Sequence, residues 1–361
     1  MILTLNAGSS SLKYGVFDLA TGRGPVVEGL VEEIGAGGGS HVEALAGVLD
    51  ALGRSGDLAR VRAVGHRVVH GGERFRVPTV ITPEVEEAID ALAPLAPLHN
   101  PANLSGIRAA RRALAAAGHG ALPHVAVFDT AFHATLPPVA YRYAVPEAWY
   151  RDYGVRKYGF HGTSHAYVSA RARQVLAKAG RPHARLVTLH LGNGCSAAAV
   201  LDGRCVDTTM GLTPLAGLVM GTRSGDVDPG LGGYLAGRGL AQADYLSALN
   251  KESGLLGVGG ASDMRALLAA RERGDASAKL ALDLYVYRLR KTVGAYAAVL
   301  GGLDAVVFTA GVGENARAVR EEVVAGLSAF EPFERLVVET EEELAIAEAV
   351  RATIDPGAGA A

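Results

Sequence analysis

The 361-residue chain carries 35 Lys and Arg against 37 Asp and Glu, so its formal net charge is −2. This length suffices for one large or two ordinary domains, and 49% hydrophobic residues can fill their cores. Because there is no basic excess to neutralise a phosphate backbone, the composition disfavours nucleic-acid binding.

The chain also lacks the features of a secreted or membrane protein. It begins MILTLNAGSSSLKY, which has no basic region and turns polar at Asn6, unlike a signal peptide. The longest apolar stretch, residues 292–312, contains Asp304 and several glycines, which disfavours a membrane span. Two cysteines, Cys195 and Cys205, cannot form a disulfide framework and fit a reducing compartment. We therefore expect a globular, cytoplasmic protein without a membrane partner.

Short apolar runs alternate with segments of helical periodicity along the chain. They first predict strands at residues 2–6, 12–19, 26–34, 61–70 and 125–129, and helices at 41–52, 84–92 and 103–117. The pattern then begins again, with helices at 164–179, 241–250, 264–273 and 276–300, and strands at 186–191, 196–201, 204–208 and 305–309. Strands that alternate with helices are typical of an α/β fold.

A weak internal repeat accompanies this restart. LTLNAGSSSLKYGVFD, from Leu3, and VTLHLGNGCSAAAVLD, from Val187, are identical at five positions, and both have the pattern strand, glycine turn, strand. Chance similarity between two β-hairpins is one interpretation. The other is a pair of similar α/β halves that face each other across a ligand cleft.

Two glycine-rich turns follow predicted strands, LGNG at 191–194 and AGVGEN at 310–315. Glycine lets backbone N–H groups approach phosphate oxygens closely. Neither turn matches the Walker or the dinucleotide-binding pattern. A single turn of this kind is more often only a turn, but two of them favour a phosphate site.

Two arginines stand in unusual surroundings. Arg67 lies in a predicted apolar strand, where it shares a face with Val69 and must be paired or face a polar cleft. A salt bridge to a nearby carboxylate is the simpler interpretation. Arg223 lies in a glycine-rich polar loop, which is either plain surface or a loop that positions a catalytic group. Two cleft arginines would suit a substrate with a carboxylate and a transferring phosphoryl group.

The histidines and carboxylates leave alternatives open. No HExxH or CxxC motif is present, so the spacing of His161 and His165 indicates a helix entry rather than zinc ligands. His161 is either a hydrogen-bond donor at a cleft or a structural histidine. Asp129 follows a strand, where α/β folds often place ligands. Glu342 begins a terminal helix, where it either complements the helix dipole or serves as a hard oxygen ligand for Mg²⁺.

Eight motifs occur in one order: NAGSSSLK, HRVVHGGERF, APLHNP, VFDTAFH, YGFHGTSH, HLGNG, MGTRSGDVDP and FTAGVGEN. Together they resemble the acetate kinase family, from residue 1 to about residue 350. The resemblance implies two duplicated actin-like, ribonuclease H-like α/β domains around a nucleotide cleft. We expect the first to comprise residues 1–148 and 344–361 and the second to comprise residues 149–343.

The resemblance also implies an activity, the transfer of the ATP γ-phosphoryl group to acetate, giving acetyl phosphate and ADP. A carboxylate is already a nucleophile, so direct in-line transfer needs no general base. Arg67 and Arg223 would bind the acyl carboxylate and stabilise the transition state. His161 would donate a hydrogen bond to the phosphoryl group, and Asn6 would contact that group.

The family's cofactor and binding sites follow in the same way. Mg²⁺, or Mn²⁺ in its place, would be held by Asn6 and Glu342 and more indirectly by Asp129, and Lys13 would contact the nucleotide. The methyl pocket would be lined by Val69, Leu98, Phe160 and Pro214, with His99 close by. The nucleotide site would be lined by His190, Leu191, Gly192, Asn193, Gly194, Asp263, Met264, Arg265, Gly311, Val312, Gly313, Glu314 and Asn315. Family members are usually homodimers, so a homodimer is expected.

Three rival functions remain. A propionate kinase shares nearly every motif, and one methylene is worth only about 1–3 kcal/mol, although Val69 favours the smaller acid. A butyrate kinase has a different pattern at HRVVHGG and APLHNP. A non-catalytic nucleotide-binding regulator would have no need of Asn6, Arg67, His161 and Arg223 together.

The sequence departs from the family pattern at several places. Cys195 replaces alanine, Thr209 replaces serine and Ala216 replaces glutamate, but none of these changes removes a catalytic group. The segment after Gly326 is shorter than in the family, and we expect the missing stretch to be a surface hairpin. The alignment of Glu342 is therefore open, with Glu341 and Glu343 as neighbouring candidates.

Overall fold

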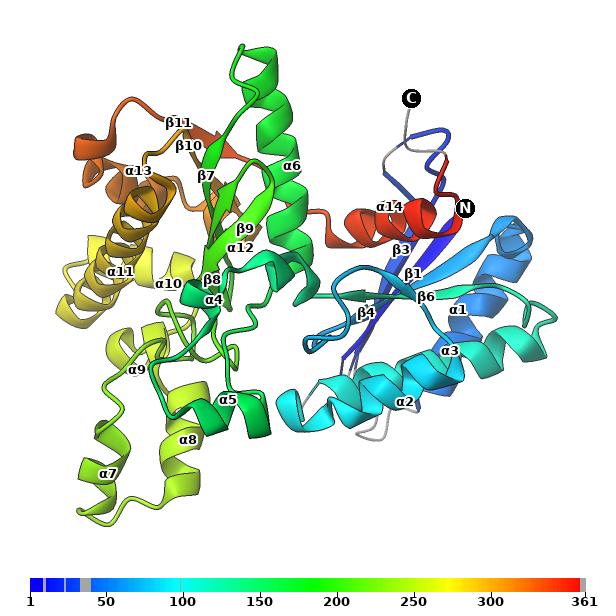
Figure 1. Ribbon diagram of the computed structural model, residues 1–361, viewed down its shortest axis with the longest axis horizontal. Coiled ribbons are helices and arrows are strands. Elements are labelled where there is room, and N and C mark those ends of the chain that lie inside the picture. Colours follow the sequence, from blue (N-terminus) through cyan, green and yellow to red (C-terminus); the bar gives the residue numbers. More distant parts are fainter. Residues whose placement is uncertain (9–10, 23, 33–39, 98, 358–361) are drawn as a thin grey trace. The chain divides into compact units, whose positions relative to one another are not determined.

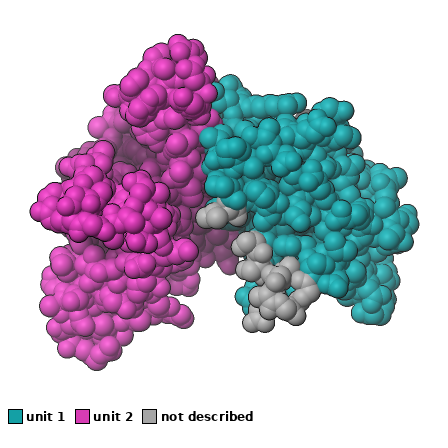
Figure 2. Space-filling view, turned by 90° about the horizontal axis from the view of Figure 1, so that it is seen from below, with its two compact units in different colours: residues 1–134, 341–361 teal, residues 135–340 magenta. Residues whose placement is uncertain are grey.

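The computed structural model describes residues 1–357 apart from 9–10, 23, 33–39 and 98 (Figure 1). The chain divides into two compact units, which Figure 2 colours teal and magenta. Unit 1 comprises Met1–Ala134 and Glu341–Ala361, so both ends of the chain belong to it, and unit 2 comprises Thr135–Thr340. Within the described residues, no helix has the length and apolar character needed to cross a membrane.

Unit 1 contains a six-stranded sheet with the strand order β3-β2-β1-β4-β6-β5. Its strands are β1 Ile2–Ala7, β2 Leu12–Phe17, β3 Pro25–Val31, β4 Ala63–Val68, β5 Thr79–Val80 and β6 His124–Phe128. β1 is antiparallel to β2 and parallel to β4, and β4 is parallel to β6. Because neighbouring parallel strands end at the same edge, residues just beyond β4 and β6 lie close together.

Helices cover both faces of this sheet (Figure 1). They are α1 His41–Ser55, α2 Pro83–Ala91, α3 Asn100–Ala116 and α14 Glu342–Ile354. Ser40 begins α1 with a capping box, in which it exchanges hydrogen bonds with Glu43. Leu3 of β1 packs with α1 and α3 in one core, whereas α14 lies against the opposite face. There, a Cβ added to Gly65 would lie 2.7 Å from side-chain atoms of both Ile346 and Val350, so only glycine admits the helix.

Unit 2 contains a five-stranded sheet with the order β11-β10-β7-β8-β9. Its strands are β7 Arg185–Leu191, β8 Cys195–Leu201, β9 Arg204–Thr208, β10 Ala305–Thr309 and β11 Glu334–Val337. β7, β8 and β9 form an antiparallel meander, and β10 is parallel to both β7 and β11. Unit 1 has the same arrangement in β1, β2, β3, β4 and β6, so the predicted pair of similar α/β halves is confirmed.

Ten helices were assigned within the described residues of unit 2. They are α4 Pro138–Tyr141, α5 Glu147–Tyr153, α6 Gly162–Lys178, α7 Leu231–Ala236, α8 Gln242–Lys251, α9 Gly254–Gly259, α10 Met264–Glu272, α11 Ala276–Leu300, α12 Ala310–Asn315 and α13 Arg317–Ala325. Ser196 of β8 contacts His165 of α6, whereas the preceding Cys195 contacts Tyr285 of α11. Successive strand residues point to opposite faces, so α6 and α11 cover opposite faces of the sheet.

Residues 135–148 pack within unit 2. Thr135 Oγ1 donates to the carbonyl of Cys205 at 2.7 Å, and the N–H of Leu212 donates to the hydroxyl of Tyr143 at 3.0 Å. The boundaries of the compact units therefore lie after Ala134 and after Thr340.

One local prediction was wrong. AGVGEN, predicted to be a turn, is the short helix α12. Its first residue, Ala310, has a positive φ of 62°, and its backbone N–H donates to Glu314 Oε1 at 2.8 Å. The chain therefore turns at Ala310 and enters a helix at once, which a glycine-rich sequence does not indicate.

Candidate active site

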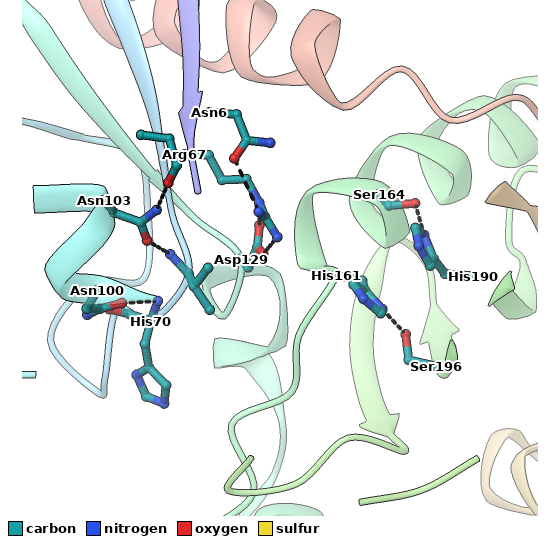
Figure 3. Close-up of polar contacts among 12 residues, drawn as sticks. Asn6, Arg67, His70, Asn100, Asn103, Asp129, His161, Ser164, His190 and Ser196 are labelled. Atoms are coloured by element: carbon teal, nitrogen blue, oxygen red, sulfur yellow. Dashed lines mark hydrogen bonds and ion pairs between the residues drawn. The ribbon is translucent and has the colours of Figure 1, made fainter. Parts of the chain in front are cut away.

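The unit 1 part of the candidate site is centred on Arg67, at the end of β4 (Figure 3). Its guanidinium binds the carboxylate of Asp129 through two hydrogen bonds, Nε to Oδ1 at 3.2 Å and Nη2 to Oδ2 at 2.5 Å. Arg67 Nη1 also donates to Asn6 Oδ1 at 3.3 Å. Asp129 directly follows β6, the parallel neighbour of β4, which explains why the two side chains meet. The simpler interpretation of Arg67, a salt bridge to a carboxylate, is confirmed.

Two further acidic side chains, Glu342 and Glu343, lie near this pair. Burial alone would lower the pKa of Arg67, but Asp129, Glu342 and Glu343 raise it above its ordinary value. Burial raises the pKa of Glu342, Arg67 opposes the shift, and Asp129 and Glu343 add to it. Glu343 also forms an ion pair with Lys13 at 2.9 Å. Unit 1 thus brings together Asn6, Arg67, Asp129 and Glu342 from three strands and a helix start.

These residues fit a magnesium ion. The described residues contain no group of three His, Cys, Asp or Glu side chains arranged to hold a metal alone. Mg²⁺, however, usually binds through one or two carboxylates together with substrate phosphates and water. Glu342, Asp129 and Asn6 offer the hard oxygen atoms that such a site needs. The pKa of the Glu342 carboxyl is raised by burial first and by the neighbouring carboxylates of Asp129 and Glu343 second, and a bound cation would oppose both effects.

Two buried asparagines of α3 hold the backbone around Arg67 (Figure 3). Asn103 accepts from the N–H of Val69 at 3.0 Å and donates to the carbonyl of Ala7 at 2.8 Å. Asn100 binds the backbone N–H and carbonyl of His70, each at 3.0 Å. Neither asparagine is among the residues predicted from the sequence. The only signal was a pair of polar residues on the buried side of a helix start.

The unit 2 part of the candidate site is centred on Gly194, in the turn between β7 and β8. A Cβ added to Gly194 would lie 2.6 Å from Arg223 Nη2 and 3.3 Å from His161 Nε2. Both side chains therefore lie against this glycine, and any larger residue would displace them. The backbone N–H of Gly221 donates to the carbonyl of Asn193 at 3.0 Å, which fastens the Arg223 loop to the same turn.

Arg223 differs from Arg67 in its partners. Its Nη1 donates to the backbone carbonyl of Pro214 at 2.7 Å. Among the described residues it forms no ion pair, since no carboxylate lies within 4.0 Å of its guanidinium. Burial accordingly lowers its pKa. A partly buried cation without a counterion is a strong attractor for an anionic ligand.

His161 is positioned by several contacts at the entry to α6, as its sequence position predicted (Figure 3). It has a positive φ of 56°, which turns the chain into the helix. Its Nδ1 lies 2.8 Å from Ser196 Oγ, and its ring stacks on that of His190 with 4.2 Å between ring centres. Ser196 Oγ also lies 2.7 Å from His165 Nε2. These contacts leave Nε2 of His161 directed at Gly194.

The two glycine segments of unit 2 are neighbours. A Cβ on Gly192 would lie 3.9 Å from Ala310 Cβ, and one on Gly313 would lie 3.6 Å from Leu191 Cβ. Both segments follow the ends of the parallel strands β7 and β10. In open α/β sheets, phosphate ligands bind at this edge. Leu191 and Gly313 are buried and hold the two segments together, whereas Gly192 is partly exposed at this edge.

Other predicted nucleotide residues have structural roles in the described residues. Asp263 caps α10 by accepting from the N–H groups of Arg265 and Ala266, and hydrogen bonds led by that of the Arg265 side chain lower its pKa to about 2. Met264 is buried. The Glu314 carboxylate accepts backbone hydrogen bonds. Asn315 Nδ2 donates to the carbonyl of Gly311 in its own helix, and the carbonyl of Val312 accepts from the N–H of Ala316.

The predicted methyl-pocket residues are divided between the units. Val69 is buried in unit 1, and Phe160 is buried in unit 2 next to His161. Pro214 belongs to the Arg223 loop of unit 2. Leu98 lies outside the described residues.

Comparisons with known proteins point to one family. A family model described as the acetokinase family matches residues 1–331. A curated acetate kinase of Deinococcus radiodurans is 54% identical over 342 residues, covering 89% of this chain and 84% of that protein. An acetate kinase of Streptomyces griseus is 51% identical over 354 residues, covering 90% of this chain and 84% of that protein.

Solved structures give the same result. The chain resembles an acetate kinase from Porphyromonas gingivalis with a TM-score of 0.90 and 40% identity, covering 98% of this chain and 99% of that one. It resembles a propionate kinase from Francisella tularensis with a TM-score of 0.90 and 39% identity, covering 96% of this chain and 98% of that one.

Proposed function

The chain belongs to the acetokinase family, and we propose on this premise that it transfers the γ-phosphoryl group of ATP to acetate, reversibly. The observation that carries the proposal is the meeting of Arg223 and His161 on Gly194. A desolvated guanidinium without a carboxylate partner, an imidazole and a glycine turn form a site for a phosphoryl group in transfer. The products are acetyl phosphate and ADP.

In this mechanism the acetate carboxylate attacks the γ-phosphorus atom directly. No side chain removes a proton, because acetate is ionised at neutral pH, so catalysis is positioning and charge neutralisation. Arg223 neutralises charge on the phosphoryl oxygens as the bond to ADP breaks. His161 donates a hydrogen bond to the same oxygens. Arg67, fixed in its plane by Asp129, orients the acyl carboxylate.

The remaining unit 1 residues would bind the metal ion and the nucleotide. Asn6 and Glu342 would hold Mg²⁺ or Mn²⁺, with Asp129 acting more indirectly, and Lys13 would contact the nucleotide. The bound cation would neutralise part of the phosphate charge. In unit 2, His190 and the turn of residues 191–194 would contact the nucleotide with Gly311 and Gly313. We also propose that the enzyme is a cytoplasmic homodimer.

A propionate kinase is the second candidate, because the solved propionate kinase is as similar in fold as the acetate kinase. The residues proposed to line the methyl pocket, Val69 among them, favour a small pocket and therefore acetate. One extra methylene changes the binding free energy by only about 1–3 kcal/mol, so the preference between acetate and propionate has to be measured.

The test is Mg²⁺-dependent acyl phosphate formation from ATP, trapped with hydroxylamine, with acetate, propionate and butyrate in parallel. We expect the highest kcat/KM with acetate. A higher kcat/KM with propionate than with acetate would retain the mechanism but overturn the interpretation of Val69. No product from any acid, with ATP still binding, would favour a non-catalytic nucleotide-binding regulator.

A further inference from the structure

Thr340 is the last residue of unit 2, just before the chain returns to unit 1. Its two hydrogen-bond donors both bind residues of unit 2 that are distant in sequence. The backbone N–H donates to Glu314 Oε1 at 3.0 Å, and the hydroxyl donates to Ser164 Oγ at 3.0 Å. Glu314 also accepts from the N–H of Ala310. Thr340 is thereby fastened to both α12 and α6.

Ser164 continues this contact toward the candidate site. It is fully buried at the start of α6, and its Oγ lies 2.8 Å from Nδ1 of His190 (Figure 3). A serine hydroxyl carries a single proton. With Thr340 as the donor to Ser164, the Ser164 proton is directed at His190 Nδ1. In this arrangement His190 accepts at Nδ1 and carries its own proton on Nε2, whereas the reverse arrangement would place that proton on Nδ1.

The other nitrogen of His190 faces the glycine turn. A Cβ placed on Gly192 would lie 3.9 Å from His190 Nε2. A proton on Nε2 presents an N–H donor to a phosphate held at this turn, whereas a proton on Nδ1 would present a lone pair that repels it. The ring of His190 also stacks on His161, so its orientation supports the neighbouring imidazole.

We propose that Thr340 is a positioning residue, whose hydroxyl acts through Ser164 to hold His190 with its proton on Nε2 facing the nucleotide. The catalytic consequence rests on the proposed function, but the protonation pattern does not. Glu314 supports the same arrangement, because its carboxylate accepts a hydrogen bond from the backbone N–H of Thr340. Two residues later the chain reaches Glu342, the proposed metal ligand of unit 1.

The experiment uses Thr340→Val, which removes the hydroxyl but keeps the shape and the backbone N–H. Nitrogen-15 NMR of histidine-labelled full-length protein reports which ring nitrogen of His190 carries the proton, without any substrate. We expect the wild type to show the Nε2–H form and T340V to gain the Nδ1–H form. The KM for ATP should rise roughly 3- to 10-fold, the scale of one lost hydrogen bond, with a smaller change in kcat.

Two matched variants separate positioning from a general loss of structure. Thr340→Ser keeps the hydroxyl and should restore both the Nε2–H signal and the KM. Thr353→Val removes a threonine hydroxyl that donates to the carbonyl of Ala349 within its own helix, and should change neither. If T340V does not fold, Ser164→Ala removes the link itself and should give the same shift at His190.

The inference is overturned if T340V, or S164A in its place, retains the Nε2–H form of His190 and the wild-type KM for ATP. An equal shift in T353V would also overturn it. Failure of the proposed function looks different: the wild type would make no acyl phosphate, while the NMR comparison of T340V with T340S would still decide whether Thr340 sets the proton position.

Discussion

The two arginines of the candidate site have opposite electrostatic surroundings. Arg67 in unit 1 is bound by Asp129 and lies near Glu342, so acidic groups outweigh its charge. Arg223 in unit 2 has a backbone carbonyl of Pro214 as its hydrogen-bond acceptor and, among the described residues, no ion pair. Unit 1 thus has negative charge to offer a cation, and unit 2 has positive charge to offer an anion. A magnesium nucleotide needs both.

The largest expected effect is on Arg223. Replacing it by alanine removes the guanidinium proposed to neutralise the phosphoryl oxygens, and we expect kcat to fall by roughly 10³-fold or more, the scale of other phosphoryl-transfer arginines. Nucleotide affinity should change far less, since the glycine turn remains. Steady-state kinetics and nucleotide titration of the variant provide the measurement.

Arg223→Lys is the control for this variant. It restores the charge but not the planar fork, and should recover only part of the lost rate. A near-normal turnover of R223A would exclude Arg223 from the transition state and remove the contrast between the two arginines.

Asp129 should matter more for stability than Arg223 does. Asp129→Ala leaves Arg67 partly buried without its partner, and we expect about 3 kcal/mol loss in the free energy of unfolding. R223A, which removes a desolvated charge without a counterion, should lose little. Urea denaturation of both variants makes the comparison, and equal losses would show that Arg67 is no more anchored than Arg223.

A substitution of Glu342 tests whether unit 1 carries a surplus of negative charge. Its raised pKa means that the folded state keeps the proton to higher pH than the unfolded state, so its contribution to stability falls as pH rises through that pKa. Glu342→Gln should therefore be at least as stable as the wild type at pH 7 without Mg²⁺. The Mg²⁺ concentration for half-maximal activity should rise roughly 10- to 100-fold.

Glu343→Gln is the matched control, because Glu343 forms an ion pair with Lys13. It should change the Mg²⁺ dependence much less than E342Q. A larger effect of E343Q would move the metal ligand by one residue.

The smallest expected effect concerns a buried histidine pair of unit 1. His66 Nε2 lies 2.8 Å from His124 Nδ1, and burial, aided by Arg111, lowers the pKa of His124 to about 4. The unfolded chain takes up this proton near pH 6.5, so stability present above that pH is lost as the pH falls toward 4. Between pH 7 and pH 5 we expect a loss of about 2 kcal/mol.

His124→Gln should reduce this pH dependence. Urea denaturation at pH 7 and pH 5 for both proteins measures the difference. An unchanged slope in H124Q would assign the acid sensitivity to other groups, His66 first.

Features set by local pattern were predictable from sequence. The hairpin strands and the long helix α11 have clear periodicity, and the repeat around Gly8 and Gly192 indicated the duplication that the two sheets confirm. The salt bridge of Arg67 followed from the cost of an arginine in an apolar strand. Sequence pattern was enough to predict these features. Each of them depends on residues close together in the chain or on the cost of burying one charged side chain.

Contacts between distant segments were not predictable. Thr340 and Ser164 are 176 positions apart, and neither stands in a pattern that indicates a partner. Asn103 supports Val69 only because α3 packs beside the end of β1. AGVGEN was misjudged for the same reason: the helix depends on Glu314, whose carboxylate also binds Thr340.

The closure of unit 1 by α14 has a consequence during synthesis. Gly65 in the middle of the sheet packs against Ile346 and Val350, which follow unit 2 in the chain. All of unit 2 is translated before them and can fold early, while one apolar face of the unit 1 sheet waits uncovered. A chain released before α14 would expose that face to chaperones and to other nascent chains. The sheet of unit 1 is therefore covered on both faces only after the whole of unit 2 has been made.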